Sequence, residues 1–322
     1  TFAKFEISGD DSEKFLERIC ANKIPKKEGS IILSHMLNEK GRIQSELTIT
    51  RFTNNNFYVL SSTASEWRDF DWFNNHKKKN ENVQIKNITN DYGVLVLAGP
   101  KSRDVLKEIT SEDVSNENFP WLKGKEIKIS NIDVKALRIN YLGELGWELH
   151  HQFKDMKNLY EIIMKSGAKH NISNFGTYAV NSLRLEKAYK GWGSELTGEI
   201  SLVESRMERF FNLEKKNEFI GSSALKKIYD EGAKIKIVYL AVDADDADPI
   251  GNEPVYYNKK IVGVVTSGGY GFRVNKSLAF AYVESDLAEK ANEFFIEIQG
   301  NMRKATVLNQ MAFDPKNIRL NS

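Results

Sequence analysis

Polar residues with spacings that could do chemistry occur in three parts of this sequence. Glu46 and Thr48 lie two residues apart in IQSELTITRF, where strand alternation would place both on one face and their apolar neighbours on the other. The stretch YLGELGWELH, residues 141–150, combines two carboxylates with two glycines and two large aromatic residues. Arg184 and Glu186 lie in a run of helical spacing. Carboxylates and a guanidinium group could hold a polar ligand through charge-assisted hydrogen bonds.

Each of these residues also has an interpretation that involves no ligand. Glu46 could lie on a solvated strand face, and Glu148 could be a charge on an exposed hairpin. Tyr141 could pack against a neighbouring strand. Arg184 and Glu186 could form an ordinary helix pair or two surface charges. Spacing alone does not decide between a binding site and a polar surface.

The first half of the chain alternates strand and helix patterns, which favours an α+β fold. Strands are predicted at 1–8, 30–37, 43–52, 55–62, 83–89 and 93–100, and helices at 11–22, 65–79 and 102–110. The link NEKGR, residues 38–42, is predicted to be a hairpin turn. The strand-like run 136–140 leads directly into 141–150, which we interpret as a hairpin whose glycines supply the turn.

In the second half the predicted elements change from helices to short strands after about residue 234. Before it, two runs predict helices, at 156–170 and 175–191. After it, short strands joined by turn-rich links are typical of a small barrel or sandwich, and they lie at 235–242, 254–271, 276–283 and 294–308. We therefore predict two domains, residues 1–228 and 229–322, with the boundary inside the segment 226–233.

Composition restricts the class of protein. The chain has 322 residues, of which 41% are hydrophobic and 28% charged, as in ordinary globular proteins. Its longest apolar runs are far shorter than the roughly 18 residues of a membrane span, so no membrane segment is predicted. Lys and Arg number 46 against 44 Asp and Glu, a net charge of +2. This near balance argues against nucleic acid as a partner, because polynucleotide binding normally needs a strongly basic surface.

The sequence offers neither a common catalytic motif nor a metal site. It contains no P-loop, no HExxH and no GxSxG, and its five histidines show no metal-ligand spacing with Asp or Glu. Its single cysteine, Cys20, excludes an internal disulfide and suits a reducing compartment. Because FLERICANKI has the pattern of a buried helix face, Cys20 is a poor candidate for a nucleophile.

Five blocks, in this order and spacing, resemble the aminomethyltransferase family, which contains the glycine-cleavage T proteins and their relatives. The blocks are GRIQSELTI, NYLGELGWEL, SLRLEKAYKGWG, FIGSSAL and VGVVTSGGYG followed by SLAFAYV. Further runs, LERICANKIP, SHMLNEKGRIQSELT, IKNITNDYGVLVLAGP and NFGTYAVNSLRLEKAYKGWG, are similar to the folate-binding half of dimethylglycine and sarcosine dehydrogenases. The resemblance covers nearly the whole chain.

The resemblance implies a fold of three lobes, two of them α+β and the third a C-terminal β-barrel, around a central opening that holds tetrahydrofolate. It implies that the chain captures a one-carbon unit, as an iminium or formaldehyde, from the oxidation of an N-methyl amine and forms 5,10-methylenetetrahydrofolate. In such proteins the FAD lies on an N-terminal flavin domain. The chain starts abruptly inside an alternating run, and we expect such a domain upstream, or a flavin oxidase as a separate partner.

The resemblance also implies roles for individual residues. Tyr141 and Glu148 match the family hairpin, where the glutamate accepts hydrogen bonds from the pterin and the tyrosine lies close to it. Glu46 matches the acidic residue nearest the reacting nitrogens, which we take as the catalytic residue, with Thr48 as its neighbour on the same strand face. The family residue there is usually Asp, so Glu46 is one methylene longer. Arg184 matches an arginine near the ligand, which we expect to position Glu148 or the folate.

Two aromatic residues are further candidates for the ligand site, and at one position the chain differs from the T proteins. Trp192 could be a loop-end core anchor or an aromatic wall for a flat ligand, and Tyr270 is a second wall residue. T proteins carry an arginine at the start of the segment that corresponds to DPIGNEPV, where this chain has Ile250 and its neighbours. That departure favours the flavin-linked relatives over T proteins that depend on a lipoyl carrier.

Two other functions stay open at this point. The chain could be a stand-alone aminomethyltransferase of the glycine-cleavage type, or a folate-binding module without turnover. We expect a cytoplasmic location, or the mitochondrial matrix if the source is eukaryotic. The identity of the amine donor and the oligomeric state do not follow from the sequence.

Overall fold

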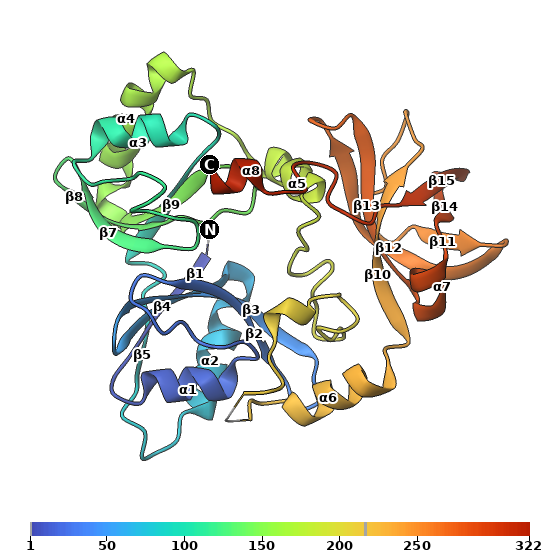
Figure 1. Cartoon of the computed structure of the whole chain (residues 1–322), viewed down its shortest axis with the longest axis horizontal. Helices are drawn as coiled ribbons and strands as arrows, with labels where there is room; N and C mark the ends of the chain where they lie inside the picture. The colour runs from blue at the N-terminus through green and yellow to red at the C-terminus, as the bar shows by residue number, and fades with distance from the viewer. Residues whose placement is uncertain (1, 216–217) are drawn as a thin grey trace.

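A computed structural model describes residues 2–215 and 218–322, and its elements gather in three lobes (Figure 1). The first lobe is a five-stranded sheet in the order β2-β3-β4-β1-β5, with two helices packed on one face. Its elements are β1 (Phe2–Ser8), α1 (Ser12–Ile19), β2 (Ile31–Leu37), β3 (Ile43–Thr53), β4 (Asn56–Ser62), the 3₁₀ turn η1 (Thr63–Ser65), α2 (Glu66–His76) and β5 (Gln84–Asn87).

The core of the first lobe lies between this sheet and its helices. Phe5 of β1 meets Phe73 of α2 edge to face, with ring centroids 5.2 Å apart, and Phe15 of α1 belongs to the same cluster. Leu47 and Ile49 of β3 point into this core and are fully buried. Alternation therefore turns the residues between them toward the opposite face of the sheet.

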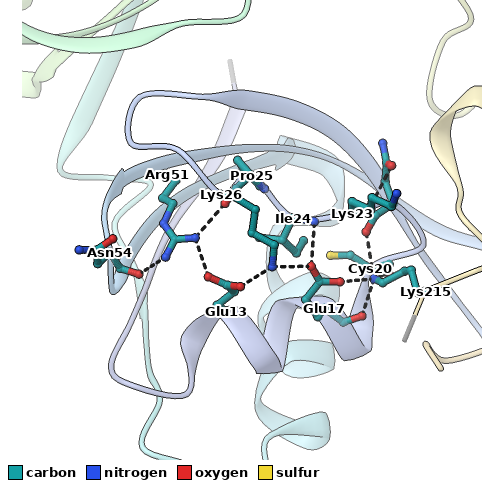
Figure 2. A network of polar contacts seen from close by, with 11 residues as sticks. Glu13, Glu17, Cys20, Lys23, Ile24, Pro25, Lys26, Arg51, Asn54 and Lys215 are labelled. Carbon is teal, nitrogen blue, oxygen red and sulfur yellow. Dashed lines mark hydrogen bonds and ion pairs between the residues drawn. The ribbon is translucent and has the colours of Figure 1, made fainter. Parts of the chain in front are cut away.

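A buried network of charges and carbonyl groups fixes α1 to the rest of the first lobe (Figure 2). The amine of Lys215 pairs with Glu17 at 2.8 Å and donates to the carbonyl oxygen of Cys20 at 2.8 Å. Arg51 of β3 donates to Glu13 at 2.6 Å. Burial raises the pKa of the Cys20 thiol to about 12, so this residue is an inert core thiol.

The second lobe repeats the same plan with a four-stranded sheet in the order β6-β9-β8-β7. Trp147, fully buried, anchors the core between this sheet and its helices. The elements are β6 (Tyr92–Ala98), α3 (Ser102–Ile109), β7 (Gly124–Ile129), β8 (Ile132–Leu137), β9 (Gly146–Gln152), η2 (Phe153–Asp155), α4 (Met156–Gly167) and η3 (Ala168–His170).

The two sheets face each other through the sides that carry no helices. Tyr58 and Leu60 of β4 form one buried cluster with Ile31 of β2 and Leu137 of β8. In β4 the alternate residues Phe57 and Val59 belong to the helix-side core. Residues of this cluster, such as Tyr58, are therefore removed from water by the packing of the two sheets.

The third lobe is a closed barrel in the order β10-β13-β12-β11-β14-β15, with β15 pairing back onto β10. Closure removes the edge strands that an open sheet would expose. Its elements are β10 (Ile235–Val242), β11 (Pro254–Tyr257), β12 (Lys260–Gly271), β13 (Lys276–Glu284), α7 (Ser285–Lys290), β14 (Glu293–Ile298) and β15 (Asn301–Val307). The predicted α+β class and the C-terminal barrel are confirmed.

A separate hydrophobic cluster ties the barrel to the first lobe through the segment between them. Leu185, Leu196 and Phe280 belong to it, together with Leu37 and Ile43 of the first sheet. The elements here are α5 (Thr177–Glu186), η4 (Glu208–Phe210) and α6 (Ser222–Glu231), and α8 (Ile318–Asn321) follows the barrel (Figure 1). The predicted division at residue 228 falls inside α6, and it stays a prediction.

Two predicted elements end earlier than the sequence pattern indicates. The helix predicted at 175–191 stops at Glu186, because the chain turns through Ala188 with φ of 53°. The predicted hairpin is formed by β8 and β9, which pair antiparallel, but the strand expected to continue to residue 140 stops at Leu137, and the connection is the loop 138–145. Glu148 therefore lies within a sheet and not on a turn. No helix among residues 2–215 and 218–322 combines the length and the apolar character needed to span a membrane.

Candidate functional site

Glu46 and Thr48 share the face of β3 that points away from the helices of the first lobe. Glu46 lies opposite His35 of β2, and its Oε2 is 3.2 Å from His35 Nε2. His35 is fully buried, whereas 24% of the Glu46 side chain is exposed. The buried imidazole of His35 thus contacts one oxygen of the carboxylate, while part of the Glu46 side chain remains exposed to solvent. A fully solvated strand face is therefore the wrong interpretation for Glu46.

Tyr141 lies on the loop 138–145 and reaches across to the segment that follows α5. Its hydroxyl donates to the carbonyl oxygen of Lys190 at 2.6 Å, and its ring stacks on Tyr189 with centroids 5.9 Å apart. The residue remains 37% exposed. These contacts fix an aromatic ring with one accessible side.

The charges around Tyr141 place several predicted residues in one neighbourhood. Burial raises the pKa of the Tyr141 hydroxyl, and the negative charges of Glu46 and Glu195 raise it further, whereas Arg184 acts in the opposite direction. Such effects require charges nearby. The structure therefore brings Glu46, Tyr141 and Arg184 together, from the first lobe, the second lobe and α5.

Arg184 makes its ion pair with Glu195, a residue that the sequence analysis missed. Its Nη1 is 2.9 Å from Glu195 Oε2, and its Nη2 donates to Ser267 Oγ at 2.9 Å. The arginine is 5% exposed and the glutamate 0%. Among the described residues, Arg184 does not make the expected contact with Glu148. Arg184 and Glu186 do not form a helix pair either, because Glu186 is paired with Arg273.

Glu195 uses both carboxylate oxygens, as a buried charge must. Its Oε2 also accepts from the backbone N–H of Gly191 at 2.7 Å. Its Oε1 accepts from the hydroxyl groups of Thr266, at 2.7 Å, and Ser267, at 2.6 Å, on the barrel strand β12. This pair joins α5, the segment after it and the barrel. The blocks KGWGSE and VTSGG carried these residues, but no local spacing relates them.

Glu148 lies between the two facing sheets and forms a second polar group with His150 and Tyr58. The Oε2 of Glu148 is 3.2 Å from His150 Nε2, and His150 Nδ1 is 3.0 Å from the hydroxyl oxygen of Tyr58. Glu148 is only 6% exposed, so the interpretation as an exposed hairpin charge is wrong. Among the described residues only its Oε2 has a hydrogen-bond partner. The Oε1 atom remains available to a ligand that donates hydrogen bonds.

Burial between the sheets affects the titration of this group. It lowers the pKa of His150 below the usual value of 6.5, although the negative charge of Glu148 acts in the opposite direction. It also raises the pKa of Tyr58, as do the nearby Tyr92 and Glu148. At neutral pH His150 is therefore uncharged.

We expect the free energy of unfolding to fall as the pH is lowered from about 7 to about 5. The folded state binds a proton on His150 more weakly than the unfolded chain, so below about pH 6.5 only the unfolded state gains protons. Each pH unit in this window can cost up to about 1.4 kcal/mol per histidine. Urea titrations at several pH values measure the slope, which His150→Gln should reduce. A stability that is constant across the window would contradict this expectation.

Trp192 and Tyr270 have packing roles that do not decide whether they also contact a ligand. Trp192 packs against the central hydrophobic cluster, and the guanidinium of Arg68 lies 5.2 Å from its ring centroid. Arg68 also donates to the carbonyl oxygen of Gln44, two residues before Glu46. Tyr270 meets Phe272 edge to face on the barrel. Trp192 thus packs against this cluster, and the wall role of both aromatics stays a prediction.

No group of three or more His, Cys, Asp or Glu side chains in the described residues is placed to hold a metal ion. Two surface hollows lie elsewhere, one beside Phe153 and Tyr160 and one beside Phe52 and Lys123. Neither includes a predicted site residue. Two groups fit a polar, partly aromatic ligand such as a pterin. They are the Oε1 atom of Glu148, which can accept hydrogen bonds, and the exposed part of the Tyr141 ring.

Comparison with known proteins agrees with this architecture. The family model described as the GCVT N-terminal domain matches residues 1–215, and the glycine cleavage T-protein C-terminal barrel domain matches residues 236–314. The solved structure of the glycine cleavage system aminomethyltransferase T from Bartonella henselae superposes with a TM-score of 0.88 at 21% identity, covering 98% of this chain and 84% of that one. At this identity the likeness establishes the fold alone.

Two curated relatives connect the chain to named enzymes. Mitochondrial dimethylglycine dehydrogenase from Homo sapiens is 44% identical over 310 residues, which cover 96% of this chain but only 36% of that protein. The aminomethyltransferase from Thermoanaerobacter sp. (strain X514) is 30% identical over 305 residues, covering 94% of this chain and 82% of that protein. The chain thus spans about a third of the longer relative and most of the shorter one. It belongs to the aminomethyltransferase family of glycine-cleavage T proteins and their relatives.

Proposed function

We propose that this chain binds tetrahydrofolate and transfers to it a one-carbon unit from an oxidised N-methyl amine, forming 5,10-methylenetetrahydrofolate. The observation that carries the proposal is the convergence of Glu46, Tyr141 and Arg184 from three parts of a fold that belongs to the aminomethyltransferase family. Tetrahydrofolate is the acceptor that this family uses. An iminium or formaldehyde carbon is already electrophilic, so capture and orientation would supply most of the catalysis.

In this proposal each polar residue has a distinct task. Glu148 accepts hydrogen bonds from the ring N–H and amino groups of the pterin, which a carboxylate binds more strongly than a neutral acceptor does. Glu46 orients the reacting nitrogens. N5 and N10 each lose a proton as they bond to the carbon; one proton goes to the amine, which leaves as its bond to that carbon breaks, and Glu46 accepts the other. His35, whose Nε2 lies 3.2 Å from Glu46 Oε2, fixes the orientation of the carboxylate.

The donor and its partner follow from the relatives. The identity of 44% to a dimethylglycine dehydrogenase favours an amine of the dimethylglycine or sarcosine type. Oxidation of such an amine would occur at FAD on a flavin domain, in the same polypeptide or in a partner. That relative is mitochondrial, so a eukaryotic source would place this chain in the mitochondrial matrix. The exposed Ile250, where T proteins carry an arginine, counts against a lipoyl-carrier donor.

Two measurements on the purified chain test the proposal. Calorimetric titration should show saturable binding of tetrahydrofolate. With formaldehyde supplied, the chain should form 5,10-methylenetetrahydrofolate faster than the uncatalysed reaction, and Glu46→Gln should lower that catalysed rate about 100-fold. Glu39→Gln, at an exposed turn of the same hairpin, is the matched control. Binding without any rate above background would identify a non-catalytic folate module, and no binding would contradict the folate proposal itself.

A further inference from the structure

The second carboxylate of YLGELGWELH, Glu144, has no part in the proposed chemistry, yet it is largely buried. Its side chain is 13% exposed, and its Oε1 accepts from Nη1 of Arg273 at 2.6 Å. Arg273 lies in the turn between β12 and β13 of the barrel. This ion pair therefore connects the loop 138–145 of the second lobe to the third lobe.

Arg273 is itself held in a fixed position. Its backbone N–H donates to Oε1 of Glu186 at 2.6 Å, and its side-chain Nε donates to the other oxygen of the same carboxylate. Glu186 is fully buried at the end of α5. The Arg273 guanidinium also lies 3.7 Å from the ring centroid of Phe313. Because Glu186 and Phe313 together restrain Arg273, this residue is a rigid ion-pair partner for Glu144.

The loop is restrained from a second side by Lys187. Gly143 has φ of 67°, and a Cβ there would lie 2.2 Å from Lys187 Cγ, so only glycine allows this close approach. The buried Lys187 amine donates to the carbonyl oxygen of Asp314 at 2.9 Å and to Asn317 Oδ1 at 2.8 Å. The backbone between Tyr141 and Glu144 therefore lies against an immobile lysine.

Two buried atoms of the ion pair have no hydrogen-bond partner in the described residues. They are Oε2 of Glu144 and Nη2 of Arg273. These are the acceptor and donor that a second, parallel hydrogen bond between the same two side chains would use. A single hydrogen bond, from Arg273 Nη1 to Glu144 Oε1, thus joins the two side chains. Its loss would remove the contact of this loop with Arg273.

We propose that Glu144 and Arg273 form a latch through which the barrel positions Tyr141, so that both are positioning residues for the folate site. This inference rests on the proposed function, because it assumes that the exposed side of Tyr141 faces the ligand. Within the loop, Tyr141 is held by its contacts with Tyr189 and Lys190, and Glu144 holds the part of the loop that follows it. Without the latch the same side chains remain present, but the loop samples positions that do not bind.

Hydrogen–deuterium exchange of the ligand-free chain tests the latch independently of any folate. In Glu144→Ala the amide of Leu142, which donates to Asn140 Oδ1 at 2.9 Å within the loop, should exchange at least about tenfold faster, while those of the barrel strands stay unchanged. Glu144→Gln keeps an acceptor for Arg273 and should lie between this variant and the wild type. Glu126→Ala removes an exposed carboxylate paired with Lys135 in the same lobe and is the matched control. Unchanged exchange in Glu144→Ala would overturn the latch.

The affinity for tetrahydrofolate distinguishes a role of Glu144 in positioning Tyr141 from a role in stabilising the fold alone. The Kd for tetrahydrofolate should rise about five- to tenfold in Glu144→Ala, less in Glu144→Gln, and not in Glu126→Ala. Faster exchange with an unchanged Kd would overturn the positioning role and leave a structural one. If Glu144→Ala fails to fold, the Glu144→Gln variant decides by the same two readouts. If the wild-type chain binds no folate, the proposed function fails, and the exchange measurement still decides whether the latch exists.

Discussion

Replacing Arg184 with methionine is expected to lower the free energy of unfolding by about 3–5 kcal/mol. The substitution leaves the fully buried carboxylate of Glu195 without its counter-charge, and removing one partner of a buried ion pair costs this much. The hydroxyl groups of Thr266 and Ser267 still donate to Glu195, but neutral donors only partly replace a guanidinium. Urea or guanidinium denaturation, followed by fluorescence, measures the loss.

A double-mutant cycle shows whether the unpaired charge causes this loss. Arg184→Met combined with Glu195→Gln removes the charge that the single variant strands, so the double variant should be more stable than Arg184→Met alone. Methionine retains much of the packing volume of the arginine stem, which limits any contribution from a cavity. A loss below about 1 kcal/mol in the single variant, or a double variant as unstable as the sum of the singles, would contradict the explanation.

Replacing Glu148 with glutamine is expected to weaken tetrahydrofolate binding at least about tenfold, or about 1.4 kcal/mol. In the proposed complex the carboxylate accepts from two pterin donors, whereas glutamine offers one acceptor and places a second donor against them. Burial strengthens the effect, because a ligand group left without a partner between the two sheets cannot turn to water. Calorimetric titration of both proteins measures the difference.

The control for Glu148→Gln must separate a lost contact from a disturbed sheet. Glutamine is nearly isosteric and can keep the contact with His150, so the free energy of unfolding should change by less than the binding energy does. Glu126→Gln, on β7 of the same sheet and exposed, should bind tetrahydrofolate like the wild type. Saturable binding that Glu148→Gln leaves unchanged would show that the pterin does not contact this residue.

Much of the fold was predictable because its signals are local. Alternation in IQSELTITRF predicted that Leu47 and Ile49 face the core while Glu46 and Thr48 share the other face, and the buried positions of Leu47 and Ile49 agree. Short strands separated by turns predicted a small barrel or sandwich, and the structure is a barrel that closes through β10 and β15. The family was recognisable from five ordered blocks, and the matches over residues 1–215 and 236–314 confirm it.

The errors concern where predicted elements end. The strand pattern before YLGELGWELH continued to residue 140, but β8 stops at Leu137, and the loop of the β8–β9 hairpin is held from outside, by Lys187 and Arg273. Helical spacing continued past Glu186, yet the chain turns at Ala188. The position of the loop is not encoded in its own segment, because Lys187 and Arg273 lie 44 and 129 residues away in sequence. The turn after α5 is closed locally, by the N–H groups of Ala188 and Tyr189.

By itself the sequence determined the elements, the class of fold, the family and the faces of individual strands, since each depends on periodicity or on motifs within one segment. Only the tertiary structure decided how charges pair. Arg184 takes Glu195 and Ser267, not Glu148, because the end of α5 meets the barrel. Glu148 is buried because two sheets face each other, a packing that leaves no periodic trace in either strand. Ion pairing depends on distances between segments, and local spacing carries no information about those distances.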